Sequence, residues 1–158
     1  MEAGQALIAT DDNNAAWTTV GKTLLSLTQT NLPSNFEFDD NDDEQEVPDL
    51  RVTLPIIEKT CTIKVTFGGY VSFRQGNNVL RIRMGTNTTY LANDEYQNLY
   101  CGITTATKEV ETFVGSVVVE LDLSTQTYVV ISMQNDESHG DILSADLART
   151  SVITEIYG

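Results

Sequence analysis

The only histidine of the chain lies in a short polar segment that contains the residue types of a hydrolytic triad. Ser138, His139 and Asp141 occur within six residues, Asp136 to Asp141. Catalysis by a triad needs side chains that meet in space, and close neighbours in sequence rarely reach that geometry. A polar turn explains the segment, and a single histidine removes most schemes that need a histidine base. We therefore expect no catalytic residues, no cofactor and no enzyme.

The most acidic stretch, residues 39–49, offers the oxygen ligands that a hard cation such as Ca²⁺ prefers. Its first, third and fifth residues match the start of an EF-hand loop, namely Asp39, Asn41 and Asp43. However, Glu44 stands where that loop needs glycine, and Leu50 where it needs a glutamate ligand. We expect no specific metal site, and a diffuse cation site is the alternative. Because such a block repels itself, an exposed arm that docks on a basic partner is the main prediction.

Cys61 and Cys101 are the two cysteines of the chain, and they lie forty residues apart. With one histidine they lack the paired ligand spacing of a structural zinc site. We expect two buried thiols that behave as small apolar side chains, and a disulfide is the alternative.

The polar stretch from Thr86 to Asn98 combines a turn with aromatic residues. The Asn87-Thr88-Thr89 triplet matches a glycosylation signal, but we interpret it as a polar turn. Aromatic rings in this stretch and near it could form a platform for a sugar, and the alternative is that they fill the core or a subunit seam. The residues concerned are Phe73, Tyr90, Tyr96 and Tyr100.

The negative charge is concentrated in the first third of the chain. The 158 residues carry a net charge of −14, of which residues 1–50 contribute 11 acids and one base, Lys22. Excess acid opposes binding to nucleic acid and to anionic membranes. No apolar run approaches the ~20 residues that span a bilayer, and the first residues do not resemble a secretory signal. We therefore expect no nucleic acid, no membrane partner and no export by the secretory route.

The elements that must position these residues are β-strands. From Leu50 onward, short runs of alternating apolar and polar residues are separated by turn signals. Residues 61–67 place Cys61, Ile63, Val65 and Phe67 on one face, and the following Gly68-Gly69 pair is expected to bend or bulge the chain. No helical pattern alternates with these runs.

Further along the chain, Leu80, Ile82 and Met84 are expected to face inward, while Arg81 and Arg83 face water. Residues 127–133 form the clearest strand, and residues 151–157 form the last one. The sequence thus predicts an all-β, antiparallel sandwich over residues 50–158, preceded by an extended acidic N-terminal arm over residues 1–49.

The segment from about Leu50 to Gly158 resembles the jelly-roll domains of the tumour-necrosis-factor and complement-C1q type. The resemblance depends on the Phe67–Phe73 strand with its glycine pair, the Val117–Leu121 run, Tyr128–Ile131 and the closing Ser151–Ile156 strand. Domains of this kind are similar to those of tailed-phage fibres and capsid decoration proteins. The resemblance implies a homotrimer with aromatic residues near the threefold axis. The seam candidates are Tyr70, Phe73, Tyr128 and Tyr157.

The leading hypothesis is a viral structural protein, a capsid decoration, cement or fibre subunit that trimerises on a phage-like virion. It would be made in the host cytoplasm and located on the virion surface, where it contacts the major capsid protein or another virion protein. The alternative is a carbohydrate- or receptor-binding module at a fibre tip. The arm residues expected to dock on the capsid are Trp17, Phe36, Phe38, Asp39, Asp40, Asp42, Asp43 and Glu44.

Overall fold

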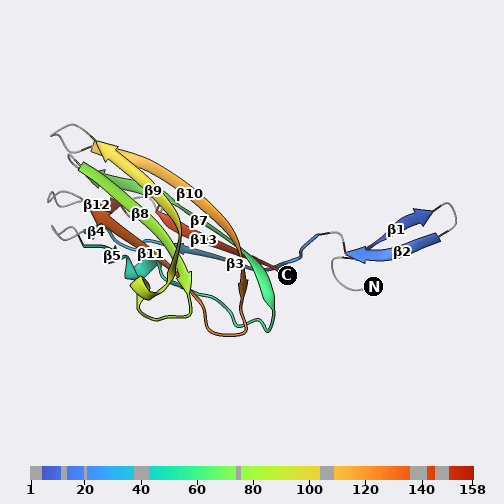
Figure 1. Cartoon of the computed structure of the whole chain (residues 1–158). Helices are drawn as coiled ribbons and strands as arrows, with labels where there is room; N and C mark the ends of the chain where they lie inside the picture. Colours follow the sequence, from blue (N-terminus) through green and yellow to red (C-terminus); the bar gives the residue numbers. More distant parts are fainter. Residues whose placement is uncertain are drawn as a thin grey trace.

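The chain folds into two antiparallel β-sheets that face each other, with a separate hairpin at the N-terminus (Figure 1). The computed structural model describes residues 5–11, 14–19, 21–37, 43–73, 76–103, 109–135, 142–144 and 150–158, with side chains for 21–37, 43–72, 79–99, 112–134 and 150–158. No α-helix occurs in these ranges. The elements are β1 (Gln5–Asp11), β2 (Asn14–Thr19), β3 (Leu24–Asn31), β4 (Phe36–Glu37), β5 (Gln45–Glu46), the 3₁₀ turn η1 (Pro48–Leu50), β6 (Val52–Thr53), β7 (Thr60–Phe73), β8 (Gly76–Gly85), the 3₁₀ turn η2 (Tyr90–Ala92), β9 (Asp94–Ile103), β10 (Glu109–Asp122), β11 (Tyr128–Asn135), β12 (Ile142–Ser144) and β13 (Ser151–Tyr157).

One sheet, which we call the β7 sheet, is built around the long strand β7. Strand β10 pairs with β7 along its whole length on one edge. On the other edge, β13 and β12 pair with successive parts of β7, and β3 and β4 pair in turn with β13 and β12. Strand β7 is therefore hydrogen-bonded on both edges.

The second sheet, the β8 sheet, has the order β5, β11, β8, β9, and β6 also pairs with β11. Along the chain, β7 lies in one sheet, β8 and β9 in the other, β10 in the first, β11 in the second and β13 in the first. This crossing between two sheets is the connectivity of a jelly roll. The predicted all-β sandwich is confirmed.

The core lies between the sheets because strand residues alternate between the two faces. On β7, the residues predicted to face inward are at most 1% exposed, namely Cys61, Ile63, Val65 and Phe67. The predicted inward residues of β8 are equally buried, and so are alternate residues of β11 and β13. These are Leu80, Ile82, Met84, Val129, Ile131, Met133, Val152 and Ile156.

The Gly68-Gly69 pair forms no bulge in the pairing of β7 with β10, one of the two outcomes expected from the sequence. Strand β7 keeps one unbroken register with β10 through both glycines. Gly69 is needed for a different reason, because a Cβ atom there would lie 2.2 Å from Thr150 Oγ1 and 2.6 Å from Thr150 Cα. The buried Thr150 hydroxyl accepts a hydrogen bond from the Tyr70 amide at 3.2 Å. The glycine thus makes room for the residue that leads into β13.

The predicted boundary of the arm at residue 49 also differs from the structure. Strand β3 pairs with β13 over seven residue pairs, and β5 pairs with β11. Leu32, Val47 and Leu50 are at most 2% exposed. These apolar residues anchor the 24–50 segment to the sandwich, although its acidic charge had suggested an arm. The part of the chain that stands apart from the sandwich in Figure 1 is the β1–β2 hairpin.

We expect Gly69→Ala to lower the free energy of unfolding by about 1–3 kcal/mol, the range for overpacked cores. The added methyl group would collide with the backbone of Thr150, which a rotamer change cannot relieve. Denaturant unfolding of the purified variant measures this loss. Ser116→Ala, an exposed position on the neighbouring strand β10, is the matched control. Equal stability of the two variants would contradict the close approach.

Candidate functional site

The outer face of the β7 sheet carries apolar side chains that no described part of the chain covers. The strand register aligns residues of neighbouring strands in rows across this face. One row contains Leu27, Glu155, Lys64 and Val118. Val114 is 73% exposed, Val118 61% and Leu27 61%. A solvated sheet face normally alternates to polar residues. Instead, apolar positions of this face reach solvent on β3 and β10, namely Leu27, Val114 and Val118.

Charged residues on this face are paired with each other. Lys64 Nζ lies 2.8 Å from Glu155 Oε2, and Lys22 forms an ion pair with Glu120 at the start of the sheet. Hydrogen bonds from Lys64 and Tyr157 lower the pKa of the Glu155 carboxyl. The opposite charges of each pair offset each other, so these groups do not require a charged partner.

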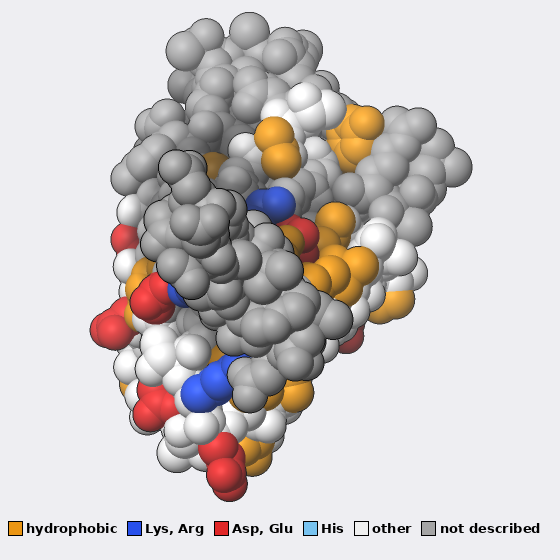
Figure 2. Space-filling view, turned by 90° about the vertical axis from the view of Figure 1, so that its right-hand side faces the viewer, with side chains coloured by type: hydrophobic (Ala, Val, Ile, Leu, Met, Phe, Trp, Pro, Cys, Tyr) orange, Lys and Arg blue, Asp and Glu red, His pale blue; other side chains and the backbone are white. Residues whose placement is uncertain are grey.

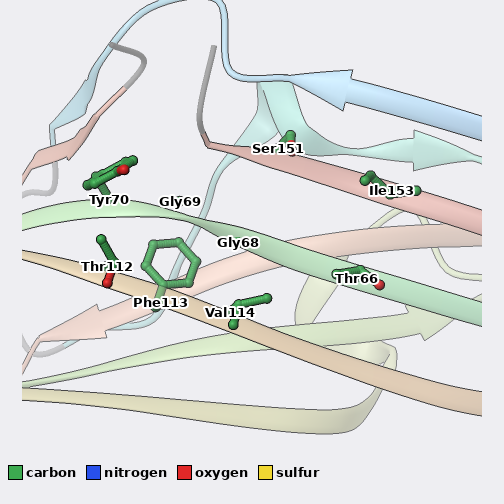
Figure 3. A pocket seen from close by; sticks show the side chains of 9 residues that line it. All are labelled: Thr66, Gly68, Gly69, Tyr70, Thr112, Phe113, Val114, Ser151 and Ile153. Carbon is green, nitrogen blue, oxygen red and sulfur yellow. The ribbon is translucent and has the colours of Figure 1, made fainter. Parts of the chain in front are cut away.

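A hollow of ≈ 490 Å³ opens in the middle of the same face (Figure 3). It lies over Gly68, which has no side chain to fill the space between its neighbours Val114 on β10 and Ser151 on β13. Figure 3 shows the Tyr70 ring beside the glycine pair at one end and Ile153 with Thr66 at the other. The face is therefore concave as well as apolar, a shape that can receive a protruding side chain.

Two of the four predicted seam residues lie on this face, at different ends of β7. Tyr70 lines the hollow, and Tyr157 lies on the same face, where its hydroxyl donates to Glu155 Oε1 at 2.7 Å. Tyr128 lies on β11 in the other sheet, with the Arg51 guanidinium 5.6 Å from its ring centre. The side chain of Phe73 lies outside the described residues.

Sequence reasoning missed the aliphatic part of this face. Val114, Val118 and Ile153 each occupy a strand position that alternation assigns to solvent. The signal was present in the run from Val117 to Val119, which is apolar at consecutive positions. A strand that is apolar on both faces indicates that both faces are covered. Figure 2 shows hydrophobic side chains reaching the surface at the end of the molecule that it views.

The outer face of the β8 sheet is different, because an ion-pair network covers it. Arg83 Nε and Nη2 lie 2.7 and 2.9 Å from the two carboxylate oxygens of Glu44. Arg81 Nε lies 3.0 Å from Glu95 Oε2. The prediction that Arg81 and Arg83 face water was wrong, since their side chains are only 14% and 13% exposed.

Glu44, one of the residues expected to dock on the capsid, is engaged within the chain by Arg83 and Ser132. Burial raises the pKa of its carboxyl, but hydrogen bonds from Arg83 and Ser132 and the charges of Arg83 and Arg81 outweigh that effect and lower it. Phe36 is half-buried and packs against the core, whereas Asp43 is exposed. The remaining arm candidates have side chains outside the described residues: Trp17, Phe38, Asp39, Asp40 and Asp42.

The aromatic platform predicted for sugar binding is not assembled from its described members. The Tyr90 hydroxyl donates to the backbone carbonyl of Glu44, and Tyr96 packs against the core. The side chains of Tyr100 and Phe73 lie outside the described residues. The 86–93 segment is a polar turn, as expected, with Asn87 exposed.

The residues singled out for catalysis and metal binding have separate outcomes. His139 and its neighbours lie outside the described residues. Cys61 is a free, buried thiol, which agrees with the main expectation for it, whereas the Cys101 side chain is not described. Within the described ranges no three His, Cys, Asp or Glu side chains are grouped to hold a metal ion. No helix in those ranges is long and apolar enough to cross a bilayer.

A comparison with solved structures finds proteins of similar fold. The structure is similar to that of the tumour-necrosis-factor protein Eiger from S. frugiperda, with a TM-score of 0.54 over 82% of this chain and 90% of that chain, at 7% identity. The chain therefore has a jelly-roll fold like that of this tumour-necrosis-factor protein. At this identity, the likeness of the two jelly rolls is one of fold alone.

Weaker likenesses link this jelly roll to larger viral chains. They include the infectious bursal disease virus Gx strain, with a TM-score of 0.41 and 11% identity, and the T13 particle of that virus, with 0.43 and 13%. Each match covers 95% of this chain but only 40% and 38% of the viral chains. TM-scores of this size do not establish a common fold. No protein-family model matches the sequence, and no curated protein matches it.

We expect Glu44→Gln to destabilise the protein by about 1.5–3 kcal/mol at pH 7, the range for hydrogen bonds to charged groups. The neutral amide leaves Arg83 and Arg81 without their shared carboxylate. The folded pKa of Glu44 lies below the ordinary value of 4.5, so its stabilisation is complete above that value and is lost as the pH falls through the folded pKa.

The measurement is urea unfolding of wild type and variant at several pH values between neutral and strongly acidic. The difference in stability should shrink toward acid pH, because protonated Glu44 resembles glutamine. Glu58→Gln, at an exposed position, is the control and should change little. A difference that stays constant over the whole pH range would rule out the ionised Glu44 as its source.

Proposed function

We propose that the chain is a structural subunit that self-associates through the outer face of its β7 sheet and forms a homotrimer on a phage-like virion. It would act there as a capsid decoration, cement or fibre protein. The observation that carries the proposal is the uncovered apolar face around Val114, Val118 and Leu27. These aliphatic side chains lie on both edges of the face, beside the Lys64–Glu155 pair, and exposed apolar surface of this kind can mark an interaction site in soluble proteins.

A second copy of the chain suits this face better than a charged partner. The ion pairs Lys64–Glu155 and Lys22–Glu120 are satisfied within one copy, so burial of the face leaves no charge of these pairs unpartnered. The hollow over Gly68 gives the flat sheet a concave place for a protruding side chain. A trimer is the order of assembly that the jelly-roll resemblance implies.

The N-terminal hairpin supports attachment to a larger particle. Strands β1 and β2 pair only with each other in the described part of the chain, and Figure 1 shows them extended away from the sandwich. A two-stranded hairpin is at best marginally stable by itself in water, so a partner surface would stabilise it. We propose the major capsid protein or another virion protein as that partner. Asp39, Asp40, Asp42 and Asp43 remain candidates for a contact with basic groups of the shell.

We expect the wild-type protein to be a trimer of three 17.4 kDa chains in solution, and Val114→Asp to be a monomer. A carboxylate at this position would be buried without a partner in the assembled state. Val114→Lys should act in the same way, because the cost is desolvation and not the sign of the charge. Light scattering coupled to size-exclusion chromatography measures the mass.

The matched control for both variants is Ile56→Asp. Ile56 is 58% exposed but lies outside the β7 sheet, so its variant should remain a trimer. A wild-type monomer at micromolar concentration would refute the assembly proposal. A trimeric Val114→Asp protein would refute the β7 face as its interface.

Deletion of residues 1–20 should abolish co-sedimentation with assembled capsids and leave the trimer intact. The deleted segment contains the whole hairpin, whereas β3 and the sandwich core begin after it. Sedimentation with purified particles, followed by light scattering of the unbound protein, gives both readouts. Undiminished binding by the shortened chain would show that the hairpin is not the attachment element.

A further inference from the structure

A second, smaller hollow of ≈ 230 Å³ lies at one end of the sandwich. It is formed where β8 turns into β9 and where β10 turns into β11. Neither the β7 face nor the hairpin contributes its central residues to it. The lining consists of Met84, Gly85, Thr86, Asn87, Ala92, Asn93, Asp94, Tyr96, Leu121, Asp122 and Thr127.

A buried amide holds the wall of this hollow in one conformation. Asn93 is 3% exposed, and its Oδ1 accepts from the Asn87 amide at 3.0 Å while its Nδ2 donates to the Asn87 carbonyl at 2.9 Å. A Cβ atom at Gly85 would lie 2.3 Å from Asn93 Oδ1, so only glycine allows this approach. The site is thus organised without a ligand, which reduces the entropic cost of binding.

The polar groups of the hollow are mainly hydrogen-bond acceptors. Asp122 Oδ1 accepts from the Ser124 amide at 2.9 Å and from the Ser124 hydroxyl, and these bonds lower the pKa of its carboxyl. These bonds orient an ionised carboxylate, and Oδ2 has no hydrogen-bond partner among the described residues. Asn87 donates its Nδ2 to the Ala92 carbonyl at 3.2 Å, which leaves its Oδ1 uninvolved, and the Asp94 carboxylate is exposed beside it.

The remaining lining is apolar or aromatic. Tyr96 and Leu121 are half-buried and Met84 is fully buried at the base, so the hollow has an apolar wall beside its acceptors. A pyranose ring has matching chemistry, with hydroxyl groups that donate to carboxylates and amides and a C–H face that packs on apolar surface. Carboxylates with a fixed orientation accept from hydroxyl groups in short, charge-assisted hydrogen bonds.

Other ligand classes fit this lining less well. It contains no Lys or Arg, so an anion such as a phosphate or sialic-acid carboxylate has no counter-charge. Its volume is below the about 300–1,000 Å³ of sites for drug-sized molecules, so the occupant is a single small ring. The described residues group no third carboxylate, cysteine or histidine with Asp94 and Asp122 to hold a metal ion.

We propose that the hollow formed by Asn87, Asp94, Asp122 and Tyr96 binds one uncharged sugar ring, as a terminal monosaccharide of a glycan. This activity goes beyond the proposed assembly role and does not depend on it. The site shares Tyr96 with the aromatic platform considered from the sequence, but not Tyr90, whose hydroxyl is bonded to Glu44.

The first experiment is a glycan array with the full-length protein, followed by saturation-transfer NMR with the free monosaccharides of any hit. We expect neutral terminal sugars to give signals, with millimolar dissociation constants for a single ring. Asp122→Asn and Asp94→Asn should each weaken binding about tenfold, the loss expected when one charge-assisted hydrogen bond is impaired. Both variants keep the volume of the side chain.

The control variant is Asp49→Asn, an exposed residue of η1 outside the hollow, which should bind like wild type. Absence of any signal from neutral sugars at millimolar concentration would overturn the proposal. Binding that survives both Asp122→Asn and Asp94→Asn would overturn the location. Binding of a diamine such as putrescine in place of sugars would overturn the ligand class. Light scattering of the same samples reports assembly separately, so a failure here is distinguishable from a failure of the trimer.

Discussion

The pairing of β7 with strands on both of its edges is the constraint on which the rest of the molecule depends. Its inward side chains, from Cys61 to Phe67, are buried in the core, and the same alternation sends Lys64 and Thr66 to the outer face. A slip of one residue in the register with β10 would exchange core and surface. The core thus fixes which residues form the outer face, and Val114 is exposed because its partner in register is Gly68.

The two outer faces of the sandwich differ in whether other groups of the chain cover their side chains. On the β8 sheet, Arg83 and Arg81 receive carboxylates from Glu44 and Glu95, so the face is closed by groups of its own chain. On the β7 sheet, the aliphatic positions have no such cover within the described residues. Hydrophobic surface is the larger driving force for association, whereas ion pairs that are already made add little. This asymmetry is the physical reason for proposing the β7 face as the contact surface.

The features predicted correctly from sequence are those that depend on neighbours along a strand. Alternation identified the inward residues of β7 and β8, because a strand's two faces are set locally. The arm boundary failed because the pairing of Leu27 with Glu155 joins residues more than a hundred positions apart. Arg83 was predicted to be exposed because Glu44, its partner, lies 39 residues away. The apolar face was visible in the sequence only as an excess of valine. The 86–98 stretch gave a signal for one side of the loop hollow, but its junction with Asp122 could not be predicted, because that residue comes from a separate turn.

The assembly face and the loop hollow are connected through β10, which places Val118 on one and Asp122 at the edge of the other. A cyclic trimer formed through the β7 sheet would therefore carry three hollows at the same end. One shallow site for a single ring binds weakly, but three sites that engage one surface gain avidity without any new contact. The hairpin leaves from that end as well, and a seven-residue strand spans about 23 Å. Attachment through the tip of the hairpin would hold the sandwich away from a shell and leave the hollows open to solvent.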